Sequence, residues 1–229
     1  NGPLPVLDQS LSREQRIEMA KNILQAMTLT GQMARLVVIV GHGASVVNNP
    51  QASALQCGAC GGHSGEVNAR VVADLLNNMD VRAGLVEHGI NVPRDTVFLA
   101  GRHDTTTDTV TLYDNDRPGS SHISDIRRAA DWFEAAGSMC RTERAIGLPH
   151  ANTGNRLYVR ARDWSEVRPE WGLSGCQAFI IAPRHVTRGK DLSGRVFLHE
   201  YNAVADTDYS ILELIMTAPV VVASWISLQ

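Results

Sequence analysis

Cysteine is scarce in this sequence, net charge is nearly absent, and no leader segment is evident. Four cysteines in 229 residues are too few for a disulfide framework, so we expect a reducing compartment. A formal net charge of -3 at pH 7 gives no reason to expect a nucleic-acid partner, and we find no DNA- or RNA-binding motif. The opening residues Asn1–Pro5 lack the basic and apolar regions of a signal peptide, so we expect none.

Apolar runs and helical periodicities alternate along the chain. The run Leu36–Val40 is short, apolar and rich in β-branched residues, which predicts a central strand buried on both faces of a parallel sheet. Further strands are expected at Asp95–Ala100, Thr109–Tyr113, Ala178–Ala182 and Arg195–Glu200, and helices at Ser12–Met27, Ser64–Asn78, Val81–His88 and Ser121–Ala136. This alternation predicts an α/β fold, a mostly parallel sheet flanked by helices, in one region over residues 1–229.

The segment 208–229 is almost entirely apolar from Ile211 onward. Glu213 and Pro219 interrupt it, which weakens its reading as a membrane span. We expect this segment to be buried or to face a partner protein.

Potential metal ligands follow the first apolar strand. His42 stands where the strand ends. The glycine-rich stretch Cys57–His63 contains two thiols, those of Cys57 and Cys60, and a second imidazole, that of His63. Thiolate and neutral imidazole are the ligands that Zn²⁺ prefers, so a zinc site is predicted. Two alternatives stay open: a redox-active Cys-x-x-Cys pair and a purely structural loop. Whether the four side chains close a structural site, or leave a position for water, is also left open by the spacing.

A second candidate group is the polar stretch that contains His103 and Asp104. A general-base role for His103 is one interpretation, with the following threonines as hydrogen-bond donors. The alternative is that Asp104 and the threonines only cap a turn between two strands. Cys140 and Cys176 show no ligand pattern and are expected to be packed as small apolar residues.

Several long motifs resemble those of one protein family. The stretches GHGASVVNNPQASALQCGACGGHSGEVNAR, HDTTTD, ARDWSEVRPEWGLSG, AFIIAPR and LELIMTAPVVVASWISLQ are similar to the DabA family, the large subunit of bacterial inorganic-carbon accumulation complexes. The resemblance runs from about Leu36 to the last residue. It implies a core like that of β-type carbonic anhydrases and a membrane partner, DabB, related to ion-translocating subunits of respiratory complex I.

The resemblance also implies a ligand set for Zn²⁺. Two ligands, a Cys and an Asp, come from a Cys-x-Asp-x-Arg motif, and the remaining His and Cys match His42 and Cys57. Zinc would lower the pKa of a bound water towards about 7, supplying the nucleophile for CO₂ hydration. No Cys-x-Asp-x-Arg motif occurs in this sequence; the nearest stretch is Cys140–Arg144, whose acidic residue comes one position too late. We therefore expect residues 1–229 to be the C-terminal part of a larger catalytic subunit, with an incomplete fold and half of a metal site, and with His103 near bicarbonate.

The function implied is a zinc-dependent subunit of an inorganic-carbon transport complex. It would convert CO₂ to bicarbonate, couple to a membrane ion-translocating partner of the DabB type, and lie at the cytoplasmic face of the membrane as a peripheral protein. One alternative is a docking fragment without activity of its own. The other is a Cys-x-x-Cys thiol oxidoreductase.

Overall fold

The computed structural model describes residues 3–45, 47, 56–116, 121–165 and 176–227. Contacts group the chain into two compact units. Unit 1 is formed by Asn1–Gln9, Ala34–Asn78 and Arg94–Gly172, and unit 2 by Ser10–Met33, Met79–Pro93 and Leu173–Gln229. Each unit draws on stretches far apart in the sequence. That residues 1–229 make up a single domain stays a prediction.

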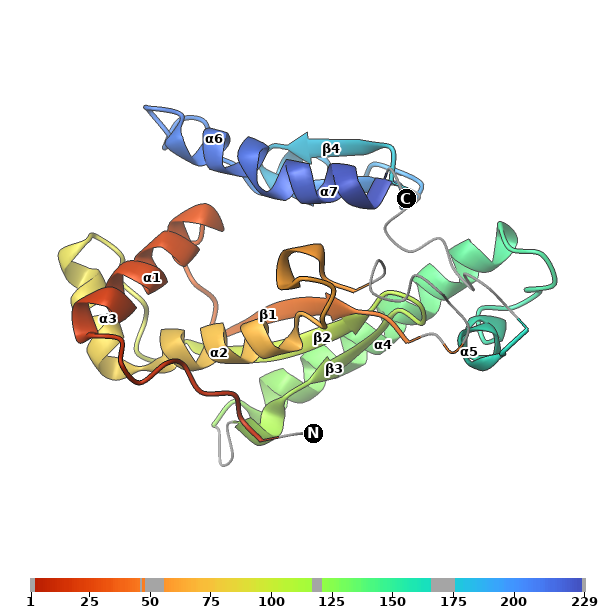
Figure 1. The fold of residues 1–229 in the computed structure, drawn as a ribbon, viewed down its shortest axis with the longest axis horizontal. Helices are drawn as coiled ribbons and strands as arrows, with labels where there is room; N and C mark the ends of the chain where they lie inside the picture. The colour runs from red at the N-terminus through yellow and green to blue at the C-terminus, as the bar shows by residue number, and fades with distance from the viewer. Residues whose placement is uncertain (1–2, 46, 48–55, 117–120, 166–175, 228–229) are drawn as a thin grey trace. The chain divides into compact units, whose positions relative to one another are not determined.

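Unit 1 is built on a three-stranded sheet in the order β1, β2, β3 (Figure 1). Strand β1 (Leu36–Gly43) pairs in parallel with β2 (Val97–Asp104), and β2 pairs antiparallel with β3 (Thr109–Leu112). Apolar β-branched and aromatic side chains favour these extended segments. The sheet is therefore mixed, and the described residues support an α/β fold without showing a mostly parallel sheet.

Helices surround this sheet. Helix α2 (Glu66–Asn77) packs against β1 and β2, and α4 (Ile123–Ile146) packs against β3 and the short α5 (Arg156–Arg162). Short 3₁₀ turns lie at Gly58–Cys60 and Asp114–Asp116.

The core of unit 1 lies between β2 and α2. Phe98 and Leu99 of β2 are buried, as is Leu76 of α2, and burying one such side chain stabilises the fold by roughly 1.5–3 kcal/mol. Because β3 pairs only with the second half of β2, another group must satisfy the backbone of Phe98. The amide of Asn77 does so, donating to the Phe98 carbonyl at 2.7 Å and accepting from its N–H at 3.1 Å.

Three expectations for unit 1 are corrected. Within the described sheet β1 is an edge strand, and its apolar residues are half-buried or exposed because only β2 pairs with it. Strand β2 continues to Asp104, so His103 and Asp104 belong to the strand rather than to the turn after it. Helix α4 runs ten residues beyond Ala136. Trp132, which the helical spacing of the apolar residues predicts to point inward, is exposed.

Unit 2 combines helices with a small sheet. Helix α1 (Arg13–Ala26) begins with a capping box, which the sequence pattern Ser12-x-x-Gln15 predicts; Ser12 and Gln15 each bind the other's backbone N–H. It packs against α3 (Met79–Glu87), where a Cβ on Gly84 would lie 2.2 Å from Cδ1 of Ile17. The glycine thus permits the close approach of the two helices.

The remaining elements of unit 2 come from the last part of the chain. Strands β4 (Ala178–Ile181) and β5 (Val196–His199) pair in parallel, and the 3₁₀ turn Arg184–Val186 lies between them. The apolar stretch that follows forms two helices, α6 (Ser210–Thr217) and α7 (Pro219–Ser227). The two helices are separated at Pro219, which is the first residue of α7. The first position of a helix is one that proline favours. Among the described residues, no helix is both long and apolar enough to cross a membrane.

Candidate functional site

His42 and His103 lie side by side where β1 and β2 end. They are partners in the register of the parallel pair, so their side chains project from the same face of the sheet. Burial lowers the pKa of His42, and the nearby His103 lowers it further. Its Nδ1 atom is buried and has no hydrogen-bond partner in the part of the chain that the structure describes. His42 is therefore held as a neutral imidazole.

The loop that carries Cys57 is attached to the same end of β1. Cys57 N–H donates to the carbonyl of His63 at 3.0 Å and closes the loop into a compact turn. On one side of this turn, Gln56 bonds both the N–H and the carbonyl of Ala44, at 3.3 and 2.9 Å. On the other side, Gly65 N–H donates to the His42 carbonyl at 2.8 Å. Both ends of the loop thus meet β1 within two residues of His42.

Glycines permit this close attachment. A Cβ on Gly41 would lie 2.2 Å from the carbonyl oxygen of Gly65, which is closer than atoms can approach. Gly61, at φ 64°, takes the left-handed conformation that the turn requires. The glycine-rich sequence is therefore explained by backbone packing as well as by any ligand.

Cys60 of the turn is a weakly acidic thiol. Burial and, to a smaller extent, a hydrogen bond with Cys57 raise the pKa of Cys60 to about 11. Asn68 also donates to its sulfur at 3.3 Å. Cys60 is therefore a protonated thiol with two local partners.

The residues present fit a zinc ion in their chemistry. A neutral imidazole with a free ring nitrogen and a half-buried free cysteine are donor types that Zn²⁺ prefers. Within the described ranges, no group of three or more His, Cys, Asp or Glu side chains is arranged to hold a metal ion. That His42 and Cys57 bind the same ion stays a prediction.

Asp104 ends β2 as a buried carboxylate. It accepts hydrogen bonds from the Ser45 hydroxyl and from both the N–H and the hydroxyl of Thr106, the latter two at 3.1 and 2.5 Å. Burial alone would raise its pKa, but these bonds and the charge of Arg102 hold the pKa below its ordinary value. Asp104 thus fastens the segment after β1 to the turn after β2.

His103 is bonded within the same turn. Its Nε2 lies 3.0 Å from Oδ1 of Asp108, and the other oxygen of that carboxylate pairs with Arg144 of α4 at 2.7 Å. Sequence reasoning missed Asp108 and Arg144 as functional residues. A usable signal was the spacing of Arg141 and Arg144, which places two guanidinium groups on one face of α4.

Two further cysteines were expected to be packed as small apolar residues. Cys140 of α4 is exposed, against this expectation, whereas Cys176 is half-buried. The charged stretch from Arg162 to Leu173 falls largely outside the described residues.

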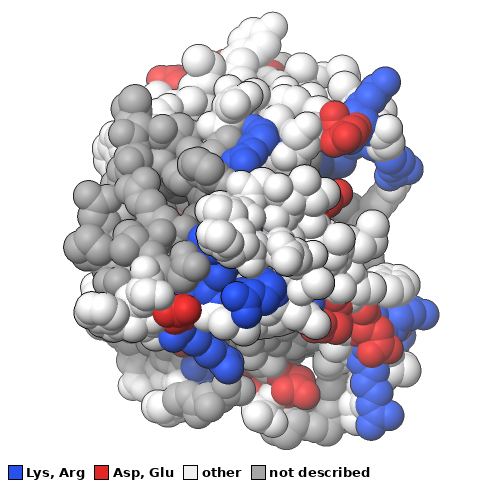
Figure 2. Space-filling view, turned by 90° about the vertical axis from the view of Figure 1, so that its right-hand side faces the viewer, with Lys and Arg blue, Asp and Glu red and all other residues white. Residues whose placement is uncertain are grey.

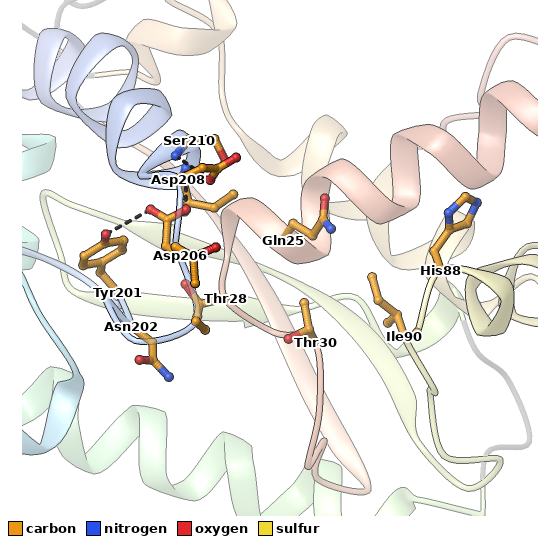
Figure 3. A pocket seen from close by; sticks show the side chains of 14 residues that line it. Gln25, Thr28, Thr30, His88, Ile90, Tyr201, Asn202, Asp206, Asp208 and Ser210 are labelled. Carbon is orange, nitrogen blue, oxygen red and sulfur yellow. Dashed lines mark hydrogen bonds between the residues drawn. The ribbon is translucent and has the colours of Figure 1, made fainter.

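A separate pocket of about 450 Å³ lies in unit 2 (Figure 3). One of its two acidic residues, Asp206, accepts a hydrogen bond from the Tyr201 hydroxyl at 2.9 Å and from the backbone N–H groups of Ile211 and Leu212 at 3.1 and 2.9 Å. The Asp206 carboxylate therefore caps the start of α6. This structural role accounts for Asp206 without a ligand.

Charges of both signs are interspersed on the molecular face drawn in Figure 2. Basic and acidic side chains lie close to one another among its described residues, in keeping with the small net charge. Neighbouring opposite charges weaken one another's long-range field.

Comparison with known proteins identifies the family. Residues 4–229 match the family model described as "Probable inorganic carbon transporter subunit DabA". Proteins of that name from Roseobacter denitrificans (strain ATCC 33942 / OCh 114) and Xanthomonas axonopodis pv. citri (strain 306) are 58% identical over 228 residues and 60% identical over 229 residues. Each alignment covers 100% of this chain and 28% of the relative's length. No solved structure matches the chain.

The match extends over nearly the whole chain, and the predicted resemblance is confirmed. The chain therefore belongs to the DabA family.

Proposed function

We propose that His42 and Cys57 bind Zn²⁺ in the full-length subunit and that this ion serves the conversion of CO₂ to bicarbonate. The observation that carries the proposal is the buried Nδ1 atom of His42, which lacks a hydrogen-bond partner among the described residues. A buried polar atom without a partner is costly, and a bound metal ion would remove that cost. The names of the relatives, inorganic carbon transporter subunits, supply the substrate class.

Each residue has a distinct part in this proposal. When bound, the zinc ion would act as a Lewis acid and lower the pKa of a water molecule to about 7. The lowered pKa of His42 keeps its imidazole neutral and so available as a ligand. Cys57 would supply a sulfur ligand from a loop that is fastened to the end of β1. His103, the register partner of His42, is a candidate to hydrogen-bond inorganic carbon at this edge.

The proposal extends to a partner. Since the relatives are named as transporter subunits, the full-length protein would act with a membrane ion-translocating protein of the DabB type, at the cytoplasmic face of the membrane. Exposed apolar side chains on α6 and α7 support a partner-facing role for residues 208–229. Examples are Met216 and Trp225, which are 55% and 59% exposed.

Zinc content tests the ligand assignment. We expect His42→Ala and Cys57→Ala, each in the full-length protein, to lose most of the zinc measured by elemental analysis. Cys60→Ser and the exposed Cys140→Ser are matched controls and should keep it. Undiminished zinc in both alanine variants would refute the assignment and favour the docking-fragment alternative.

The thiol oxidoreductase alternative draws on the hydrogen bond between Cys57 and Cys60. It requires both cysteines equally, whereas the zinc proposal makes Cys57 dominant. Equal loss of function in Cys57→Ser and Cys60→Ser, with zinc retained, would favour the redox alternative.

A further inference from the structure

Arg144 makes three contacts with the turn that follows β2. Its guanidinium donates to the carbonyls of Thr105 and Thr106 at 2.8 and 3.1 Å and pairs with the Asp108 carboxylate at 2.7 Å. Arg141, one turn earlier on α4, donates to the Thr107 carbonyl at 3.0 Å. The turn is therefore attached to α4 through these two arginine side chains.

Asp108 links Arg144 to His103. One carboxylate oxygen lies 3.0 Å from Nε2 of His103, and the other lies 2.7 Å from Arg144. A carboxylate can only accept hydrogen bonds, so Nε2 of His103 must be the donor. The proton of a neutral His103 then resides on Nε2, and Nδ1 keeps its lone pair.

The backbone of Asp108 is fixed by the helix as well. Asp108 has φ 51°, a conformation uncommon for a residue other than glycine. A Cβ on Gly137 of α4 would lie 2.2 Å from the Asp108 carbonyl oxygen, so only glycine permits this approach. The side chains of Asp108 and Arg144 are 11% and 19% exposed, and that of His103 is 37% exposed. A shielded ion pair thus supports an imidazole that solvent and small solutes can reach.

We propose that Arg144 is a positioning residue that acts through Asp108 on His103. Arg144 holds the carboxylate, and the carboxylate fixes both the ring orientation and the tautomer of His103. The Nδ1 lone pair of His103 is then presented beside His42. The inference rests on the proposed function only for the identity of the solute that His103 meets, which would be inorganic carbon.

Acylation by diethylpyrocarbonate tests this chain of contacts without relying on activity. The reagent is applied to the full-length protein, and modification of His103 is measured by peptide mass spectrometry. Asp108→Asn should raise the rate at His103 by about tenfold, because it removes the charge-assisted hydrogen bond that occupies Nε2 and restrains the ring. Arg144→Ala should raise the rate by a similar factor, because the carboxylate that makes this bond is no longer held in place. Arg144→Lys should restore most of the protection. Arg128→Ala is the matched control, since Arg128 is an exposed α4 arginine that pairs with Asp125.

His122 reports on folding in the same experiment. It is 3% exposed and its Nε2 lies 2.7 Å from the Asp95 carbonyl oxygen, so it should stay unmodified while unit 1 is folded. An unchanged rate at His103 in Asp108→Asn, or in Arg144→Ala with His122 protected, would overturn the proposal. If Arg144→Ala exposes His122, that variant is unfolded and the other two variants decide the question. Faster modification of His103 in Asp108→Asn, together with a rate near the wild-type rate in Arg144→Lys, would support the proposal. Any other pair of rates would overturn it.

Zinc content separates this inference from the function on which it rests. A wild-type protein that binds no zinc but shows the expected labelling pattern would refute the metal proposal and leave the positioning role standing. If zinc content depends on His42 and Cys57 but the rate of His103 modification is the same with and without Arg144, the metal proposal would stand and the positioning role would be refuted.

Discussion

Asp104 illustrates how one residue can join two loops at a sheet edge. Its carboxylate collects hydrogen bonds from Ser45, beyond β1, and from Thr106, beyond β2. These bonds outweigh the cost of burying a charge, and the pKa of Asp104 lies below its ordinary value of 3.8. A carboxylate with a lowered pKa stabilises the fold above its ordinary pKa and loses that contribution as pH falls through the lowered value.

Replacing Asp104 should therefore have a pH-dependent cost. We expect Asp104→Asn to lower the free energy of unfolding by about 1–3 kcal/mol at pH 7, because an amide cannot accept all three bonds. The difference from wild type should shrink as pH falls below about 4, where the wild-type carboxylate loses its own advantage. Urea unfolding at pH 7 and in acid measures both effects. Asp131→Asn, at an exposed position of α4, should change neither, and an equal cost at both pH values for Asp104→Asn would contradict this account.

Residue chemistry at the candidate site could be predicted only in part. The sequence places His42 where a predicted strand ends and His103 in the polar stretch that follows another, and the structure aligns the two residues in register. Asp108 and Arg144 could not be connected in the same way, because their contact depends on how α4 packs beside β3. The sequence shows which side chains can act as ligands or bases, whereas which distant side chains contact one another depends on how the helices and strands pack.

At the scale of elements, α4 shows why local periodicity was an incomplete guide. The predicted helix ended at Ala136, yet α4 continues to Ile146 with Gly137, Arg141 and Ala145 on its buried side. Glycine and arginine do not belong to an apolar helical face, so the spacing of apolar residues did not predict the part of α4 on which the turn after β2 packs. By contrast, α1 begins after Ser12, where the capping box predicted its start.

The close approach at Gly137 leads to a prediction that opposes helix propensity. In a helix interior, alanine is more favourable than glycine by about 1 kcal/mol. Gly137→Ala should nonetheless destabilise the protein, by about 1–3 kcal/mol, because the added methyl group would overlap the Asp108 carbonyl. Thermal unfolding measures the change.

Gly147 offers a matched control at the end of the same helix. A Cβ there would come no closer than 3.7 Å to Arg144 O, and the residue has φ -87°. Gly147→Ala should be neutral or slightly stabilising. A stabilising Gly137→Ala would show that the turn can move away from α4, and would weaken the positioning role of Arg144.

At the scale of the whole molecule, each unit is assembled from segments distant in the sequence. The periodicities predicted α1 and α3 separately, but their contact at Ile17 and Gly84 brings together residues whose association no local pattern encodes. The mixed strand directions have a similar origin. An apolar run predicts a strand, while its neighbour and direction depend on the path of the intervening chain.

The proposed partner makes a prediction at this same scale. Trp225 on α7 and Met216 on α6 are large apolar side chains left exposed, and large buried anchors contribute most of the binding energy in protein interfaces. In the full-length subunit, Met216→Gln with Trp225→Gln should weaken co-purification with the membrane partner by at least about fivefold. Zinc content should be unchanged, because neither residue belongs to unit 1.

Trp132 provides the control for this experiment. It is a tryptophan on α4 that is 66% exposed, so Trp132→Gln removes a comparable apolar side chain from unit 1. If Trp132→Gln releases the partner while the double variant on α6 and α7 does not, the partner binds unit 1 rather than the segment 208–229. Retention by all variants would instead mean that the apolar side chains of α6 and α7 serve packing within the full-length subunit, and the partner-facing role of this segment would have to be abandoned.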